Sequence, residues 1–126
     1  MSERASWVKL VSTLNRLTQA NKINWQSENP PQILTAGTSD QIPLYFSARH
    51  NARDLGLYEE RYQTMDDYER TYWTSRVVLV FFDQDDRPIW ELPGEVAGLR
   101  ELFDAIRYQS SGVNDFIRSL EEDDDE

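Results

Sequence analysis

Residues 71–92 read TYWTSRVVLVFFDQDDRPIWEL, and the rest of the fold is expected to form around them. Two runs rich in β-branched and aromatic residues flank the polar segment DQDDR, a pattern typical of two antiparallel strands joined by a tight turn. The first run contains six consecutive apolar residues, Val77 to Phe82. A strand that is apolar on both sides is expected to be covered on both faces. The sequence therefore predicts that this hairpin lies at the centre of the molecule.

The pairing of the hairpin depends on the length of its loop, because a shift of one residue exchanges the faces of the second strand. A loop of residues 84–87 would pair Phe82 with Ile89, Phe81 with Trp90, Val80 with Glu91 and Leu79 with Leu92. The better core face would then carry Trp73, Val77, Leu79, Phe81, Trp90 and Leu92. The other face is mixed and would carry Arg76, Val78, Val80, Phe82, Ile89 and Glu91. We expect a loop or the polar middle of the chain to cover this mixed face, and a partner surface is the alternative.

Composition limits the classes of function. The chain has 126 residues, of which 39% are hydrophobic and 12% aromatic, as expected of one folded domain. The net charge is −10, but residues 121–126 are all acidic, and the remainder holds 13 basic against 17 acidic residues. Nucleic-acid binding is disfavoured by this charge. Cysteine is absent, which excludes disulfides and thiolate sites.

Apolar periodicity predicts helices at both ends of the chain. Residues 2–20 place Trp7, Leu10, Val11, Leu14 and Leu17 on one face, with Ser2 as a candidate N-cap and Asn21 as a left-handed stop. Residues 95–109 form a second amphipathic helix. A short third helix after Asn114 carries Phe116, Ile117 and Leu120. We expect a single domain over residues 1–120 and a disordered acidic tail over residues 121–126.

Between the helices the sequence predicts strands. Lys22–Trp25 alternates polar and apolar residues, residues 32–35 form a possible short strand, and residues 42–48 a longer one. Residues 49–70 fit a short helix, a long loop or a third strand from about Leu57. The expected fold is α+β: an antiparallel meander of about four to five strands, with the N-terminal helix and the C-terminal helices packed on one face.

The segment LNRLTQANKINW, residues 14–25, resembles a group of short prokaryotic and phage proteins. These have a leading helix, a Lys-Ile-x-Trp strand, a β-meander and closing helices. The resemblance implies a small cytoplasmic accessory or mobile-element protein of bacterial origin. It supplies no catalytic residues, because the group has no established activity.

The residues that could carry chemistry form no recognisable motif. Ser47, His50 and Asp54 can be written as a triad, but a triad is defined by geometry, and no nucleophile-elbow motif surrounds the serine. The turn DQDDR fails the calcium-loop template, because Pro88 stands where glycine is required and Gly94 where glutamate is required. Asp66, Asp67 and Glu69 could help to bind a hard cation but lack a second cluster. We therefore expect no catalytic, metal or cofactor site.

Arginines and tyrosines are interleaved with acids in the middle of the chain, and both residue types are enriched at protein interfaces. The predicted partner-binding residues are Tyr58, Tyr62, Tyr68, Trp73, Arg61 and Arg76. Internal salt bridges are the alternative explanation of these arginines. An acidic mimic of nucleic acid is a further possibility, but the body's modest net charge of −4 counts against it.

The sequence thus predicts a non-enzymatic protein-interaction module: an adaptor, inhibitor, immunity-type or antitoxin-like protein. The alternatives are a self-associating protein that uses the face or edge of the hairpin, and a small ligand-binding protein or enzyme around His50, Arg49 and Arg53. The expected partner is another protein, with no direct contact to nucleic acid. The chain contains no apolar run long enough to span a membrane and no recognisable signal peptide, so a cytoplasmic location is expected.

Overall fold

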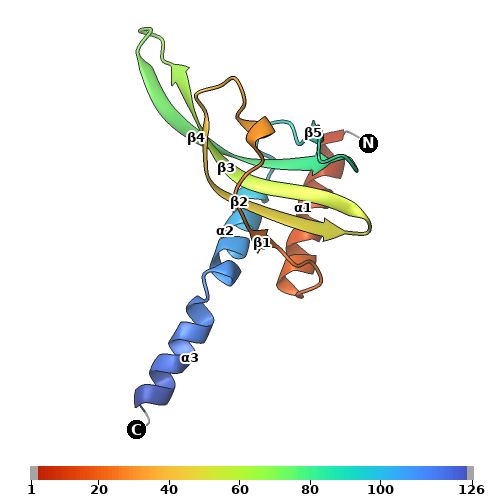
Figure 1. Cartoon of the computed structure of the whole chain (residues 1–126), viewed down its shortest axis with the longest axis vertical. Coiled ribbons are helices and arrows are strands. Elements are labelled where there is room, and N and C mark those ends of the chain that lie inside the picture. The colour runs from red at the N-terminus through yellow and green to blue at the C-terminus, as the bar shows by residue number, and fades with distance from the viewer. Residues whose placement is uncertain (1–2, 125–126) are drawn as a thin grey trace.

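The computed structural model describes residues 3–124, which form an α+β fold built on one antiparallel sheet (Figure 1). The elements, in chain order, are α1 (Glu3–Gln19), β1 (Gln26–Ser27), the 3-10 helix η1 (Gln32–Leu34), β2 (Gln41–His50), β3 (Arg53–Met65), β4 (Thr71–Phe82), β5 (Pro88–Glu91), α2 (Leu99–Ser110) and α3 (Val113–Asp124). The five strands lie in the order β1-β2-β3-β4-β5, so each is hydrogen-bonded to its neighbour in sequence. The expected meander is confirmed.

The β4–β5 hairpin has most of the predicted register. Val80 pairs with Glu91, Phe81 pairs with Trp90, and the Leu92 amide donates to the Leu79 carbonyl at 2.9 Å. The predicted pairing of Phe82 with Ile89 is wrong. An irregularity between Phe81 and Phe82 places Phe82 opposite Pro88, because an extra residue shifts the ladder there. Ile89 is therefore left 55% exposed instead of joining the mixed face.

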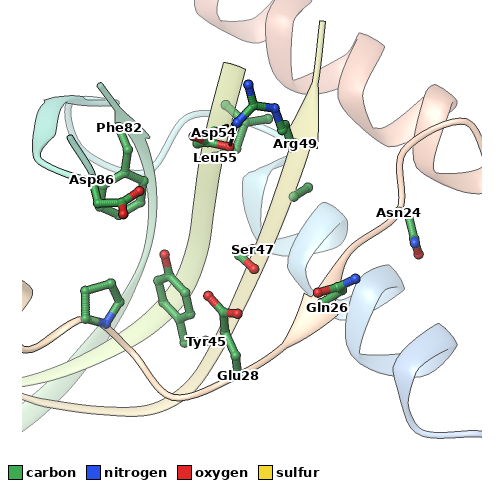
Figure 2. A pocket seen from close by; sticks show the side chains of 12 residues that line it. Asn24, Gln26, Glu28, Tyr45, Ser47, Arg49, Asp54, Leu55, Phe82 and Asp86 are labelled. Carbon is green, nitrogen blue, oxygen red and sulfur yellow. Dashed lines mark hydrogen bonds and ion pairs between the residues drawn. The ribbon is translucent and has the colours of Figure 1, made fainter. Parts of the chain in front are cut away.

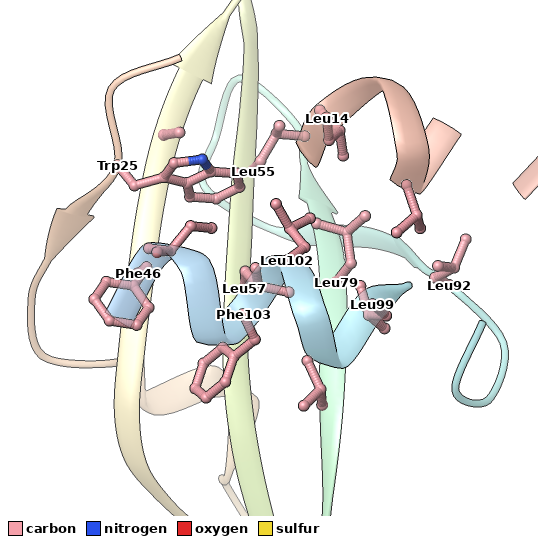
Figure 3. Packing of buried hydrophobic residues seen from close by; sticks show 14 of the residues in the cluster. Leu14, Trp25, Phe46, Leu55, Leu57, Leu79, Leu92, Leu99, Leu102 and Phe103 are labelled. Carbon is pink, nitrogen blue, oxygen red and sulfur yellow. The ribbon is translucent and has the colours of Figure 1, made fainter. Parts of the chain in front are cut away.

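The main core lies between the sheet and two helices. Val11 and Leu14 of α1 pack with Leu99 and Leu102 of α2 against the inward-facing side chains of β2, β3 and β4 (Figure 3). The expected core face contributes Val77, Leu79 and Leu92, with Phe81 packed against them. Trp73 belongs to the same face of β4 but lies 40% exposed, beyond the cover of the helices. A helix covers only the part of a strand that it crosses. The apolar face of β4 therefore extends beyond the part of the strand that is buried in the main core.

The opposite face of the sheet holds a second, smaller cluster formed by Tyr45, Tyr58, Val78, Val80 and Phe82. Leu34 of η1 packs against this cluster, as does Ile42. The mixed face is thus covered in part by the loop that carries η1. Cover by a loop was one of the two possibilities expected from the sequence. Tyr45 and Tyr58 lie side by side on β2 and β3, with ring centroids 5.7 Å apart.

Two short strands were placed wrongly from the sequence. Residues 22–25 are irregular, and only Gln26–Ser27 pair with β2. Ile23 and Trp25 are nevertheless buried, because the chain leaves α1 across the edge of the main core. Residues 32–34 form a 3-10 turn instead of a strand. Alternation of polar and apolar residues shows that every second side chain is buried, but it does not show that the backbone is a strand. An irregular segment that crosses a core produces the same pattern.

The difficult middle of the chain is mostly strand. β3 extends from Arg53 to Met65 and pairs with β4 over its whole length from Asp54. Of the alternatives for residues 49–70, the third strand is therefore correct, although it begins four residues before Leu57. Polar residues dominate the second half of β3, from Arg61 onward, because this half is largely exposed.

The turns that begin at Asp66 and Asp83 have the same construction. In each, the aspartate carboxylate accepts backbone N–H bonds from the residues two and four positions later, all at 2.9 Å. The arginine at the fourth position also binds the carboxylate, in the pairs Arg70–Asp66 and Arg87–Asp83. Backbone hydrogen bonds, first of all that from the arginine, hold the pKa of both aspartates below the usual range. The carboxylates of Asp66 and Asp83 therefore stabilise the turns that they begin.

The C-terminal end differs from the expectation in two ways. α1 and α2 pack on one face of the sheet as predicted, but α3 has no buried residue and extends away from the sheet (Figure 1). The acidic tail expected to be disordered from residue 121 is helical through Asp124, and its last two residues lie outside the described range. The predicted first helix is confirmed, with Asn21 in the left-handed conformation at its end, whereas the predicted cap Ser2 lies outside the described residues. Each of the helices in residues 3–124 is too short or too polar to traverse a lipid bilayer.

Candidate partner-binding surfaces

The β-arm, residues 61–75, is the far half of the β3–β4 hairpin and projects beyond the helices (Figure 1). β2 pairs with β3 only as far as Gln41–Arg61, and β5 pairs with β4 only near Val80–Phe82. Both outer edges of the β-arm are therefore unpaired in the described part of the chain. Unpaired edges and exposed aromatics are the features that an interacting sheet would use.

Arginines of the β-arm and its base lie over aromatic rings. The guanidinium of Arg61 is 5.7 Å from the Trp73 ring centroid, and that of Arg70 is 5.2 Å from the Tyr68 centroid. At the base of the arm, Arg76 lies 5.5 Å from the centroid of Tyr62. Cation–π contacts at exposed sites contribute about 0.5–1 kcal/mol each. They stiffen a two-stranded ribbon that would otherwise be marginally stable.

The six predicted partner-binding residues do not form one surface. Tyr58 is only 3% exposed, because the alternation of side chains along β3 directs it into the second cluster, toward Val78 and Tyr45. It is therefore not part of a partner-binding surface. Strand alternation places Arg61 and Trp73 on one face of the hairpin and Tyr62 and Arg76 on the other. Tyr68, at the tip, is 80% exposed.

Arg76 also has a structural role, because it pairs with a buried acid. Its Nη2 lies 3.2 Å from Oε2 of Glu60, a residue only 7% exposed, and 3.9 Å from Oε1 of Glu91. The alternative explanation of internal salt bridges thus holds for Arg76, and also for the pairs Arg49–Asp54 and Arg70–Asp66. Burial raises the pKa of Glu60, and a hydrogen bond shared with Asp40 raises it further, against the opposing effect of Arg76.

The raised pKa of Glu60 predicts a pH dependence of stability. A carboxyl group whose pKa is higher in the folded than in the unfolded state stabilises the fold when protonated, and this contribution is lost as pH rises through the folded pKa. We expect the free energy of unfolding of the wild type, minus that of the variant Glu60→Gln, to decrease from pH 4 to pH 8 in urea titrations. Asp66 and Asp83 titrate in both proteins and cancel in this difference. A difference that rises with pH would contradict the assignment.

The structure does not assemble the triad written from the sequence. On β2 the side chains alternate, so Ser47 and Arg49 lie on the face of the second cluster and His50 lies on the opposite face. Asp54 pairs with Arg49, whose Nη1 is 3.4 Å from its Oδ1, and so lies on the side away from His50. Among residues 3–124, no group of three or more metal-ligating side chains is arranged to hold an ion.

The second-face groove lies between the loop after β1 and the β4–β5 turn and encloses about 640 Å³ (Figure 2). Its lining residues are Asn24, Gln26, Glu28, Pro31, Tyr45, Ser47, Ala48, Arg49, Asp54, Leu55, Phe82 and Asp86. His50 is not among them. The interpretation of a pocket centred on His50 is therefore not supported, although Arg49 does reach the groove.

α3 presents an exposed apolar surface that the partner prediction missed. Val113, Phe116, Ile117 and Leu120 are 38%, 63%, 44% and 50% exposed, and all follow helical spacing on one face. The sequence shows this periodicity, but periodicity alone does not reveal whether an apolar face packs within the chain or remains free. We refer to these four residues as the α3 stripe.

Comparison with known proteins supplies no relative. No protein family, curated protein or solved structure matches this chain. The resemblance of residues 14–25 to short prokaryotic and phage proteins stays a prediction.

Proposed function

We propose that this protein is a non-enzymatic protein-interaction module that docks through α3 into an apolar groove flanked by lysine and arginine side chains on a partner protein. The observation that carries the proposal is the α3 stripe: an apolar helix face that no part of residues 3–124 covers. An adaptor or inhibitor role and a cytoplasmic, mobile-element setting belong to the same proposal.

The spacing of the stripe fits a helix that binds in a groove. Val113, Phe116, Ile117 and Leu120 occupy positions i, i+3, i+4 and i+7, the pattern by which amphipathic helices anchor in hydrophobic grooves. A packed core would leave such residues buried, as it does in α2, where Leu99, Leu102, Phe103 and Ile106 are at most 1% exposed. The two helices share the same apolar periodicity, but only the face of α2 is covered by the protein itself.

The charge of α3 indicates the chemistry of the partner. The helix contains five acids and one base, Arg118, and four of the acids, residues 121–124, occupy its C-terminal end. Carboxylates at a helix C-terminus are unfavourable, because they face the negative end of the helix dipole. A helix of 12 residues is also marginal in isolation. Basic side chains beside the groove would neutralise these carboxylates and stabilise the helix on binding.

The start of α3 positions the stripe. Gly112 adopts φ 73°, and the Ser111 hydroxyl donates to the Tyr108 carbonyl at 2.7 Å while its oxygen accepts from the Val113 amide at 3.2 Å. The Tyr108 hydroxyl donates to the Asn114 side-chain oxygen at 2.6 Å. These contacts join α2 to α3 through a short turn and separate the docking face from the sheet.

Photo-cross-linking tests the proposal. A benzoylphenylalanine at position 117, within the stripe, should cross-link one protein in the native host, whereas the same group at position 119, on the polar face, should not. With that protein purified, Ile117→Glu should weaken binding roughly 10-fold or more, because it removes the burial of a large aliphatic side chain. Ser119→Ala should bind normally, and the affinity of the wild type should fall as salt increases.

Equal cross-linking from both positions, or binding unaffected by Ile117→Glu, would rule the proposal out. A cross-link only to a second copy of the chain would place self-association on α3 and would also contradict docking to a partner protein. Self-association through the β-arm is a second candidate function, and it rests on a separate observation, the unpaired edges and exposed aromatics of the β-arm. It requires a dimer mass in sedimentation experiments that Trp73→Glu abolishes.

A further inference from the structure

The second-face groove has a feature that neither docking surface explains. Tyr45 is 2% exposed, yet no hydrogen bond links its hydroxyl to any described residue. Every fully enclosed polar side-chain atom in the described residues has a partner. The unpaired hydroxyl must therefore be reached from the groove, and Figure 2 shows it directed into that space.

The position of this hydroxyl is determined by a glycine. A Cβ atom at Gly56 would lie 2.6 Å from the Tyr45 hydroxyl oxygen and 2.9 Å from side-chain atoms of Val80 and Phe82. The tyrosine ring therefore extends across the bare backbone of Gly56 on the neighbouring strand. A hydroxyl that is held in place, opens only into a groove and has no partner inside the chain is available to a ligand.

Carboxylates surround the same space. Glu28, Asp54 and Asp86 line the groove together with one cation, Arg49. Arg49 is paired with Asp54, whereas Glu28 and Asp86 have no ion-pair partner among the described residues. The Glu28 amide donates to the Tyr45 carbonyl at 3.2 Å, so the backbone at this acid is fixed beside the tyrosine.

The tyrosine is protonated at neutral pH. Burial raises the pKa of Tyr45, and the nearby charges of Glu28, Asp54 and Asp86 raise it further. The hydroxyl oxygen of a neutral tyrosine can accept a hydrogen bond, and the two unpaired carboxylates can accept others. Phe82 and Pro31 add an apolar wall.

We propose that the groove binds a small organic cation, an ammonium or guanidinium group on an aliphatic stem. Glu28 and Asp86 balance the charge, the Tyr45 hydroxyl accepts one N–H hydrogen bond, and the stem lies against Phe82. The cation can come from a free amine or from a lysine or arginine side chain of a protein. This site is independent of α3, so it stands or fails separately from the proposed docking.

Binding of butylguanidinium to the full chain, followed by ¹H–¹⁵N NMR at low salt, tests the site. We expect saturable shifts confined to residues 26–31, 45–49, 54–56 and 82–86. Butylurea has the same stem and a planar head without the charge, and it should bind about 10-fold more weakly or not at all. The peptide acetyl-Gly-Arg-Gly-amide distinguishes the sources: tighter binding than butylguanidinium indicates a protein side chain, and weaker binding indicates a free amine.

Two variants connect binding to the named groups, and a third is a control. Asp86→Asn keeps the shape of a residue at φ 60° and should weaken binding about 10-fold. Tyr45→Phe should weaken binding about 5-fold without destabilising the protein, because the hydroxyl has no internal partner to lose. Glu101→Gln, the same loss of charge on the exposed side of α2, should bind like the wild type.

Several results would overturn the site. Equal affinity for butylurea would show that charge is not recognised, and unchanged binding by Asp86→Asn or Tyr45→Phe would place the cation elsewhere. Shifts confined to residues 121–124 would mean that the acidic end of α3 attracts cations without a site. The absence of saturable shifts at millimolar probe concentrations would remove the proposal altogether.

Discussion

Phe103→Ala should destabilise the protein by about 3–5 kcal/mol, the range observed when a large aromatic side chain is removed from a core. Phe103 is 1% exposed in α2, and its ring meets the edge of Phe46 on β2 at a centroid distance of 5.8 Å. Its removal leaves a cavity between helix and sheet at the centre of the main core. Urea titration followed by circular dichroism measures the loss.

Phe116→Ala is the matched control, with the same change one helix later. Phe116 is 63% exposed in α3, and a surface substitution should change stability by less than about 0.5 kcal/mol. The contrast between the two phenylalanines tests the fold and the docking surface together. A large loss at Phe116 would show that α3 packs against the body in solution, and the α3 stripe would then be part of the core.

Gly56→Ala should destabilise the protein by about 1–3 kcal/mol, because it overpacks the second cluster. Gly56 has ordinary strand geometry, so a methyl group with free space around it would stabilise the fold slightly by restricting the unfolded chain. The close approach of Tyr45, Val80 and Phe82 reverses the sign. Thermal unfolding measures the direction as well as the size of the effect.

The double variant Gly56→Ala with Tyr45→Phe separates the contributions of these contacts. Removal of the hydroxyl relieves the shortest contact, so we expect partial recovery of stability, with the contacts to Val80 and Phe82 remaining. Stability at or above the wild-type value for Gly56→Ala alone would mean that the tyrosine does not lie across this backbone. The groove proposal would then lose the feature that orients its hydroxyl.

The two proposals use different consequences of the same architecture. The sheet is covered on one face by α1 and α2 and on the other only by a loop, which leaves the second-face groove open beside Tyr45. The chain then leaves the body at Gly112, which leaves the α3 stripe without a cover. A cation site on one side and a docking helix at the end can operate in one protein without sharing a residue.

Several elements could be predicted from the sequence because the signals for them are local. The apolar run from Val77 to Phe82 identified the central strand, and the turn of residues 83–87 set the pairing of Phe81 with Trp90. Periodicity of 3.6 residues identified the three helices, although the second begins at Leu99 and not at residue 95, and Asn21 marked the end of the first. Local signals suffice in these cases because turn chemistry and the spacing of apolar residues act within a few positions.

The residues that cover each face could not be predicted from such local signals. Tyr58 and Tyr62 have similar surroundings in sequence, yet Tyr58 is buried beside Tyr45, and Tyr62 lies where β2 no longer pairs with β3. Ser47 and His50 are three residues apart but face opposite sides of the sheet, which separates the triad. Phe103 and Phe116 occupy equivalent apolar faces, and only the first meets a sheet. An apolar pattern indicates which side of a helix or strand is buried from water. The side chains that bury it come from residues distant in the chain or from another molecule, so the local pattern does not identify them.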